Sequence, residues 1–226
     1  MILGFDADDT LWHNEDGFQA SHREFEQLLA EWADPETIDD QLFTIESRNL
    51  PRYGYGVKAY TLSMIECAIA VSGGQIGADA ISTMLDLGHA LLDRPIELLD
   101  GVEEVLDELG RHQLMIITKG DLYHQLLRIE NSGLQHRFWQ SEVVAHKDPS
   151  TYQRVLKLHG VAPEEFVMVG NSVPSDVLPV LAVGGRAVHI PYHVTWTHER
   201  HDGDHGAPTL NNMRELPDLL SDWGLH

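Results

Sequence analysis

Three carboxylates stand within four positions near the start of the chain, where residues 5–10 read FDADDT. The apolar residues 1–5 predict a short buried strand, so Asp6, Asp8 and Asp9 must lie close together at its end. Carboxylates in such a cluster repel one another and lose hydration on burial, so positive charge has to compensate them. Oxygen ligands without a thiolate suit Mg²⁺. The segment therefore predicts a magnesium site at which one aspartate binds the metal and attacks, while another faces the leaving group.

Other polar groups follow the remaining apolar runs of the sequence. The run 114–117 leads into Thr118 and Lys119, and the run 166–169 leads through Gly170 into Asn171. A lysine precedes the helix that begins near Asp148 and Pro149. In an open parallel sheet, ligands bind beyond the carboxyl ends of the strands, so groups far apart in sequence meet at one edge. We expect this edge to bring together Asp6, Asp8, Thr118, Lys119, Lys147, Asn171 and Asp176.

The order of the apolar runs predicts the fold that positions these groups. After residue 95, helical periodicity alternates with short apolar runs, which is typical of parallel strands joined by right-handed crossovers. The predicted strands are residues 1–5, 114–118, 142–145, 166–170 and 186–190. Residues 15–95 carry helical periodicity almost throughout. We therefore predict an α/β core with a doubly wound parallel sheet, made of residues 1–14 and 96–226, and an inserted helical domain of residues 15–95.

The charge balance limits the partners of the chain. Among 226 residues, 15 are basic and 36 acidic, for a formal net charge of −21. This argues against nonspecific nucleic-acid binding and against anionic membranes, and an anionic substrate would need a local cation. No apolar run reaches the roughly 20 residues that span a bilayer. Because there is no basic signal region and only one cysteine, Cys67, we expect a cytoplasmic protein without internal disulfides and with Cys67 in the core.

Taken in order, these residues resemble the four motifs of the haloacid dehalogenase-like (HAD) hydrolases. The matching segments are Asp6-Ala7-Asp8-Asp9-Thr10, Thr118 after an apolar run, Lys147, and Gly170-Asn171-Ser172-Val173-Pro174-Ser175-Asp176. A lone DxDxT motif is a weak signal, whereas four motifs in order at strand ends or helix starts are specific. The resemblance covers roughly residues 1–190, and the helical insertion resembles the type-1 cap of the phosphatase branch.

The resemblance implies catalytic roles for four residues. Asp6 is the expected nucleophile, which forms an aspartyl-phosphate. Asp8 is the expected acid and base, which protonates the leaving oxygen and then activates water. Thr118 is expected to hydrogen-bond the phosphoryl oxygens, and Lys147 to neutralise charge on Asp6 and the phosphoryl group.

The resemblance also implies a Mg²⁺ site made by Asp6, Asp8, Asn171 and Asp176, to which Asp8 contributes its backbone carbonyl. Many relatives carry an aspartate where this chain has Asn171, so the neutral amide predicts weaker metal binding, either directly or through water. Asp9 replaces a glycine that is common in the first motif, and we expect it to cap the turn or to be solvated.

Residues 48–58, RNLPRYGYGVK, concentrate basic and aromatic groups in an otherwise acidic chain. Caps of this type close over the site and read the leaving group of the substrate. The candidate substrate-binding residues are therefore Arg52, Tyr55, Lys58, Thr118 and Lys119. Alternatively, the aromatic residues of this segment pack the insertion and its basic residues pair with nearby acids.

The predicted function is Mg²⁺-dependent hydrolysis of a phosphomonoester, with a small phosphorylated metabolite as substrate because a closed cap leaves little room for macromolecules. Three alternatives stay open: a phosphomutase or a 2-haloacid dehalogenase on the same fold, and a non-catalytic HAD-like binding protein. Asp8 weighs against dehalogenation, because a halide leaves without a proton. The sequence does not decide between a monomer and a homodimer.

Five histidines lie within 17 residues of the tail, at His189, His193, His198, His201 and His205. Spacings of three and four would suit a zinc site on a helix. Gly203, Gly206 and Pro208 oppose a regular helix, so we expect residues 191–208 to form a solvated loop.

Overall fold

The computed structural model describes residues 1–225, and the chain divides into two compact units. The first unit contains Met1–Glu15 and Ile96–His226, and the second contains Asp16–Pro95. The sequence placed the start of the helical unit at residue 15, one residue earlier than in the structure, and its end at residue 95, as in the structure. No helix within residues 1–225 is both long and apolar enough to cross a membrane.

The first unit is built on a five-stranded sheet in the order β3-β2-β1-β4-β5, with every neighbouring pair parallel. The strands are β1 (Ile2–Phe5), β2 (Gln113–Lys119), β3 (Gln140–Val144), β4 (Phe166–Gly170) and β5 (Arg186–His189). Phe5 is level with Ile116 on β2 and with Val169 on β4, so these three strands end at one edge. The predicted doubly wound parallel sheet is confirmed.

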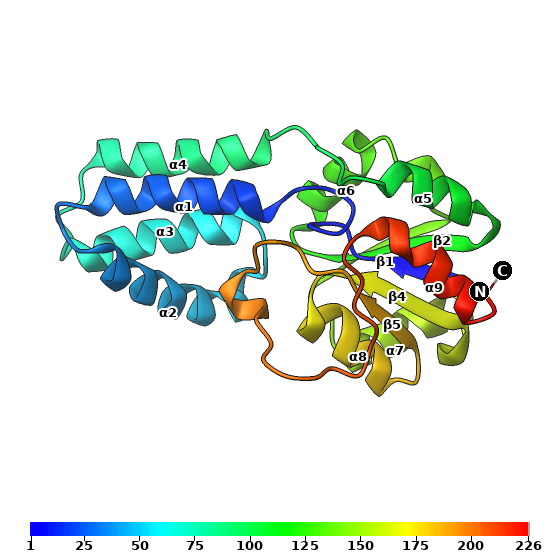
Figure 1. The fold of residues 1–226 in the computed structure, drawn as a ribbon. Coiled ribbons are helices and arrows are strands. Elements are labelled where there is room, and N and C mark those ends of the chain that lie inside the picture. Colours follow the sequence, from blue (N-terminus) through cyan, green and yellow to red (C-terminus); the bar gives the residue numbers. More distant parts are fainter. Residues whose placement is uncertain (226) are drawn as a thin grey trace. The chain divides into compact units, whose positions relative to one another are not determined.

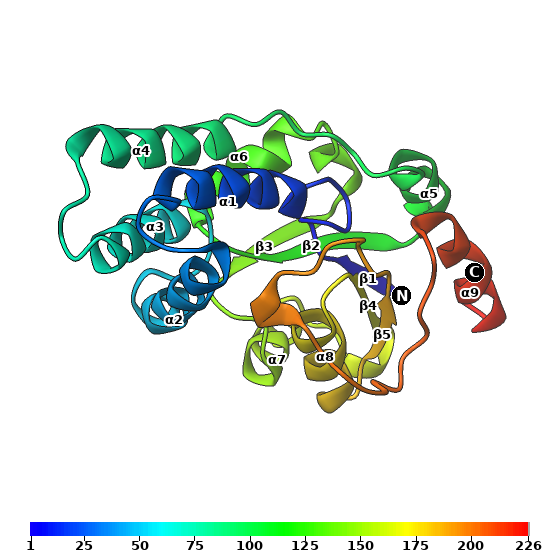
Figure 2. The same cartoon turned by 60° about the vertical axis from the view of Figure 1, so that its left-hand side comes forward.

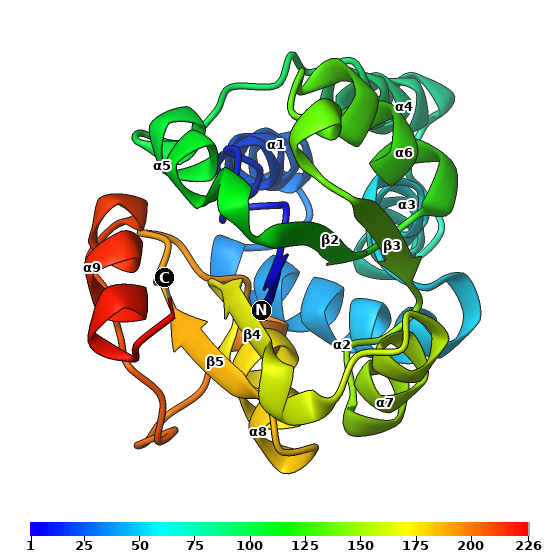
Figure 3. The same cartoon turned by 90° about the vertical axis from the view of Figure 1, so that its right-hand side faces the viewer.

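Helices cover both faces of this sheet, which explains why its strands read as continuous apolar runs. The helices of this unit are α5 (Val102–Glu108), α6 (Leu122–Asn131), α7 (Pro149–Leu158), α8 (Leu178–Ala182) and α9 (Leu216–Asp222). Alternate strand residues enter one core with α5, α6 and α9, and the others enter a second core with α7 and α8. Figure 3 shows α7 and α8 on one side of the sheet and α5 and α9 on the other.

Two elements were not predicted from the sequence. A single π turn at Val173–Val177 comes before α8. Helix α9 was not predicted; its buried residues Leu216 and Leu220 belong to the same core as β1.

The second unit contains four helices that pack side by side (Figure 1): α1 (Glu15–Leu29), α2 (Pro35–Tyr53), α3 (Val57–Val71) and α4 (Ala78–Leu92). Asp34 caps α2 by accepting a hydrogen bond from the backbone N–H of Thr37 at 2.9 Å. Helix α2 continues through Pro51 and ends before Gly54, whose φ of 71° lies in the left-handed region. Cys67 is buried in the core of this unit, as predicted.

Candidate active site

The candidate site lies at the carboxyl edge of the sheet. Asp6 directly follows β1 and donates its backbone N–H to the carbonyl of Val169 on β4 at 2.9 Å. Thr118 is near the end of β2, and Asn171 directly follows β4. Three segments that are far apart in sequence thus bring their polar residues to one edge, as the parallel topology requires.

Lys147 connects two carboxylates at this edge. Its Nζ donates to Oδ1 of Asp6 at 2.5 Å and to Oδ1 of Asp176 at 2.6 Å, and all three residues are buried. Burial raises the pKa of Asp6 to about 7, because desolvation and the charge of Asp176 outweigh the attraction of the shared lysine. Burial alone would lower the pKa of Lys147, but the two carboxylates together raise it. The lysine thus stays charged between two acids.

Asp8 faces a different cation. Its Oδ1 accepts a hydrogen bond from Nε1 of Trp12 at 2.7 Å and lies 3.2 Å from Nε of Arg128 in an ion pair. Its Oδ2 accepts a hydrogen bond from Nε2 of Gln125 at 2.8 Å. Gln125 and Arg128 are both buried on α6. These two residues were not predicted from the sequence, although their spacing of three, followed by the apolar Ile129, places them on the core-facing side of a helix.

Asp9 has a structural role. It is buried and has a φ of 62°, the left-handed region that favours glycine. Its Oδ1 accepts hydrogen bonds from the backbone N–H groups of Asn14 at 2.8 Å and Glu15 at 3.0 Å, where α1 begins. Burial raises the pKa of Asp9 to about 8, although these N–H groups favour its charged form. Of the two expectations for Asp9, capping is confirmed and solvation is wrong.

The acidic run at the end of β1 is therefore compensated in three separate ways. Asp6 uses Lys147, Asp8 uses Arg128, and Asp9 uses the backbone N–H groups before α1. All three acids lie beyond the end of β1, so the turn that follows the strand, and not strand alternation, gives each acid different surroundings. The tertiary structure thus supplies much of the positive charge that the sequence analysis assigned to a metal ion.

Thr118 and Lys119 lie beside this arrangement. Thr118 is buried, and its Oγ1 accepts a hydrogen bond from Nε2 of Gln125 at 3.0 Å. Lys119 donates to Oγ of Ser175 at 2.9 Å and forms an ion pair with Glu199. Burial, followed by the nearby charge of Lys147, lowers the pKa of Lys119 to about 8.

Glu199 belongs to the segment after β5, which can be followed in orange in Figure 2. This segment is irregular, as predicted, but it is not simply solvated, since the Glu199 side chain is only 14% exposed. Tyr192 places its hydroxyl 2.6 Å from Nδ1 of His13, and His189 places Nε2 at 3.1 Å from the carbonyl of Asn171. The segment after β5 therefore contacts the end of β2 and the residues after β1, and His189 at the end of β5 contacts the residue after β4.

The oxygen groups at this edge fit Mg²⁺, which proteins usually bind through one or two carboxylates together with water or phosphate oxygens. Asp6 and Asp176 each supply a carboxylate, and Lys147 uses only Oδ1 of each. Oδ1 of Asn171 accepts a hydrogen bond from Oγ1 of Thr10 at 3.3 Å, which keeps this amide at the edge. The carboxylate of Asp8 is bound by Gln125 and Arg128 of α6, so the group through which this residue could bind the metal is its backbone carbonyl.

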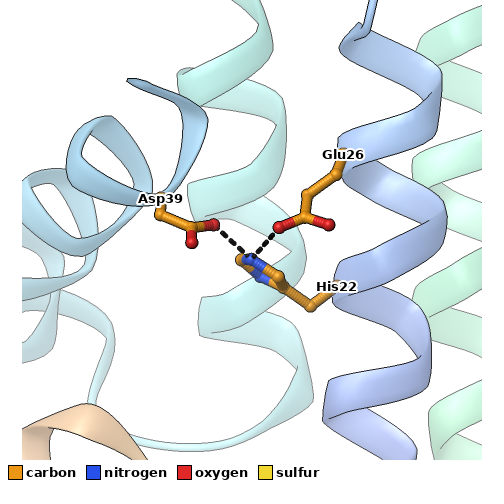
Figure 4. Close-up of side chains that lie close together, drawn as sticks. All are labelled: His22, Glu26 and Asp39. Atoms are coloured by element: carbon orange, nitrogen blue, oxygen red, sulfur yellow. Dashed lines mark hydrogen bonds and ion pairs between the residues drawn. The ribbon is translucent and has the colours of Figure 1, made fainter. Parts of the chain in front are cut away.

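Within residues 1–225, three potential ligand atoms of His, Cys, Asp or Glu come within 4.8 Å of one another only at His22, Glu26 and Asp39. Figure 4 shows Nε2 of His22 facing both carboxylates, at 2.6 Å from Asp39 and 3.3 Å from Glu26. The hydrogen bond between His22 and the exposed Asp39 joins α1 to α2, and Glu26 lies one turn along α1 within ion-pair distance of the same ring nitrogen. Within the described residues, the tail histidines form no such group.

The predicted substrate contacts of the helical unit lie at the turn between α2 and α3. Arg52 and Lys58 are exposed, and Tyr55 is half-buried, which raises the pKa of its hydroxyl. Arg48 pairs with Glu66 at 2.5 Å, so pairing with an acid explains that one basic residue. Contact of Arg52, Tyr55 and Lys58 with a substrate stays a prediction.

Comparisons with known proteins agree with this fold and site. A family model described as haloacid dehalogenase-like hydrolase matches residues 1–184, and the chain therefore belongs to this family. The crystal structure of a haloacid dehalogenase-like family hydrolase from Xanthomonas campestris is 39% identical, with a TM-score of 0.89 over 98% of this chain and 91% of that chain. No curated protein matched the sequence.

More distant structures share the fold alone. A 2-haloacid dehalogenase from Pseudomonas syringae pv. tomato is 21% identical, with a TM-score of 0.63 over 98% of both chains. The HAD-hydrolase YfnB from Bacillus subtilis, described as bound to magnesium, is 18% identical, with a TM-score of 0.67 over 97% of this chain and 98% of that chain. Similarity at this level transfers neither the halide chemistry of the first nor the metal of the second.

Proposed function

We propose that the protein is a Mg²⁺-dependent phosphomonoester hydrolase that acts on a small phosphorylated metabolite through an aspartyl-phosphate on Asp6. The observation that carries this proposal is a second carboxylate, Asp8, two residues beyond the nucleophile and bound by three side chains. An alkoxide leaving group needs a proton, which such a residue can supply, whereas a halide does not.

The side chains on the Asp6 side suit attack on phosphorus. Asp6 would use one carboxylate oxygen as nucleophile while Lys147 compensates the other, and Asp176 keeps the lysine in place. Bound Mg²⁺, held by Asp6, Asp176, Asn171 and the backbone carbonyl of Asp8, would neutralise phosphoryl charge. The hydroxyl of Thr118 would donate to a phosphoryl oxygen while it accepts from Gln125.

The side chains on the Asp8 side suit proton transfer. Within residues 1–225, Oδ2 of Asp8 accepts a hydrogen bond only from Gln125, so a lone pair remains for the leaving-group proton. We further propose that the helical unit acts as the cap, and that Arg52, Tyr55 and Lys58 contact the part of the substrate that leaves. A cap that closes over the site would restrict the substrate to small molecules.

A phosphate-release assay on a panel of phosphate esters, with Mg²⁺ and with a chelator, tests this function. We expect turnover with Mg²⁺, little turnover with the chelator, and none for Asp6→Asn, which lacks the nucleophile. Asp40→Asn, an exposed aspartate on α2, is the matched control and should keep wild-type rates. Full activity of Asp6→Asn would refute the proposal, and an isomerised sugar phosphate without phosphate release would indicate a mutase.

One observation favours 2-haloacid dehalogenation as a second candidate. Lys147 alone bridges Asp6 and Asp176, so the nucleophile can be held in place without a metal ion. Halide release from 2-chloropropionate, measured with and without the chelator, tests this reaction. Metal-independent halide release without phosphate release would replace the first candidate by the second.

A further inference from the structure

We infer that Gln125 and Arg128 are positioning residues that hold Asp8 for proton transfer to the leaving group. The inference rests on the proposed phosphatase function and adds two residues to its site. Both residues lie on α6, outside the four sequence motifs, and act on the substrate only through Asp8.

The start of α6 places Gln125 under the end of β2. Asp121 caps the helix by accepting a hydrogen bond from the backbone N–H of His124 at 2.9 Å. A Cβ at Gly120 would lie 3.1 Å from the Gln125 side chain, and the φ of 148° at Gly120 also favours glycine. The turn between β2 and α6 is therefore shaped so that Gln125 can pack against it.

Gln125 links the candidate acid to the candidate phosphoryl donor. Its Nε2 donates to Oδ2 of Asp8 at 2.8 Å, to Oγ1 of Thr118 at 3.0 Å and to the carbonyl of Lys119 at 3.0 Å. Its Oε1 is buried and has no hydrogen-bond partner within residues 1–225. The buried, unpaired Oε1 costs stability and does not itself explain an amide at this position. The contacts of Nε2 with Asp8 and Thr118 do.

Arg128 holds the other oxygen of Asp8. Its Nε forms the 3.2 Å ion pair with Oδ1, and its Nη2 donates to the carbonyl of His13 at 3.3 Å. Its guanidinium carbon lies 5.8 Å from the ring centroid of Trp12, which itself donates to Oδ1. Arg128 and Trp12 thus engage Oδ1 from two directions, which leaves Oδ2 as the oxygen that faces the leaving group.

The dependence of rate on the leaving group tests this assignment. Para-nitrophenyl phosphate releases a stable anion, whereas ethyl phosphate releases an alkoxide that needs a proton. We expect Gln125→Met and Arg128→Met to lower kcat/KM for ethyl phosphate by roughly tenfold or more, and for the aryl ester by less than about threefold, since general acids contribute 10²–10⁴-fold. The ratio kcat/KM reports the step that forms the aspartyl-phosphate, so later hydrolysis does not obscure the comparison.

Matched variants separate positioning from general damage to the fold. Gln153→Met and Arg154→Met change the same residue types at exposed sites on α7 and should leave both esters unaffected. Arg128→Lys keeps a cation near Asp8 and should restore part of the activity on ethyl phosphate. In an Asp8→Asn background, Gln125→Met should add no further leaving-group effect, because the group that it positions is gone.

The outcomes are distinguishable. Wild-type protein that releases phosphate from neither ester would overturn the proposed function and this inference with it. If the wild type is active but the variants lose activity equally on both esters, the inference alone is overturned. The same holds if Gln125→Met causes its full loss in the Asp8→Asn background. Gln125 and Arg128 would then act by positioning Thr118 or by stabilising the fold.

Discussion

Asp6 and Asp8 both follow β1 and are only two residues apart, yet their surroundings differ in charge and exposure. On the Asp6 side, two carboxylates share one ammonium, and the side chains of Lys147 and Asp176 are almost completely buried. On the Asp8 side, one carboxylate has its own guanidinium and its side chain is 24% exposed. The Asp6 side keeps an excess of negative charge that a divalent cation can balance. On the Asp8 side the charge is already balanced, and the carboxylate is accessible to a substrate.

The largest effect should come from removing the cation of the Asp6 side. Lys147→Met leaves two buried carboxylates unpaired, and removal of one partner of a buried pair typically costs about 3–5 kcal/mol. We therefore expect a lower free energy of unfolding in urea and loss of phosphatase turnover. Lys157→Met, an exposed lysine on α7, is the control. Unchanged stability of Lys147→Met would mean that the buried bridge does not compensate Asp6 and Asp176.

Changing the acid of the Asp8 side should affect activity more than stability. Asp8→Asn removes the transferable proton, and kcat/KM for ethyl phosphate should fall by about 10²–10⁴-fold. The loss in free energy of unfolding should be smaller than for Lys147→Met, because Asp8 is partly exposed. If Asp8→Asn hydrolysed ethyl phosphate at the wild-type rate, Asp8 would not be the residue that transfers the proton to the leaving group.

The pKa of Lys119 predicts a smaller effect, on substrate binding. With a pKa of about 8, Lys119 is charged at neutral pH and loses its charge as the pH rises through that value. If Lys119 contacts the phosphate group, KM should increase severalfold above about pH 8, and Lys119→Met should have a high KM at every pH. A steep pH dependence of KM that persists in Lys119→Met would assign the titration to another group.

The smallest effect is expected from changing Asp9, the third aspartate after β1. Asp9→Gly removes the cap at Asn14 and Glu15 but allows the positive φ of this position without strain. These changes oppose each other, so we expect the melting temperature to shift by a few degrees at most and kcat/KM to stay within about threefold of wild type, since a cap is typically worth ~1 kcal/mol. A loss as large as that of Asp8→Asn would show that Asp9 takes part in the chemistry.

Several features could be predicted from the sequence because they depend on local patterns. Apolar runs gave the strands within two residues at each end, and the parallel topology placed Asp6, Thr118 and Asn171 at one edge. The π turn was not predictable, since Val173 to Val177 carry an ordinary helical pattern. The approach of Glu199 to Lys119 was not predictable either, because it joins an irregular segment to a strand end.

What the sequence by itself determined is the order of strands and helices, and with it the set of polar residues that reach the carboxyl edge. What only the tertiary structure decided is which cation each acid faces. Helical periodicity places Gln125 and Arg128 on the buried side of α6, but the packing of α6 in the same core as β1 sets their contact with Asp8. Such pairings depend on distances between elements, and the period of a single element carries no information about them.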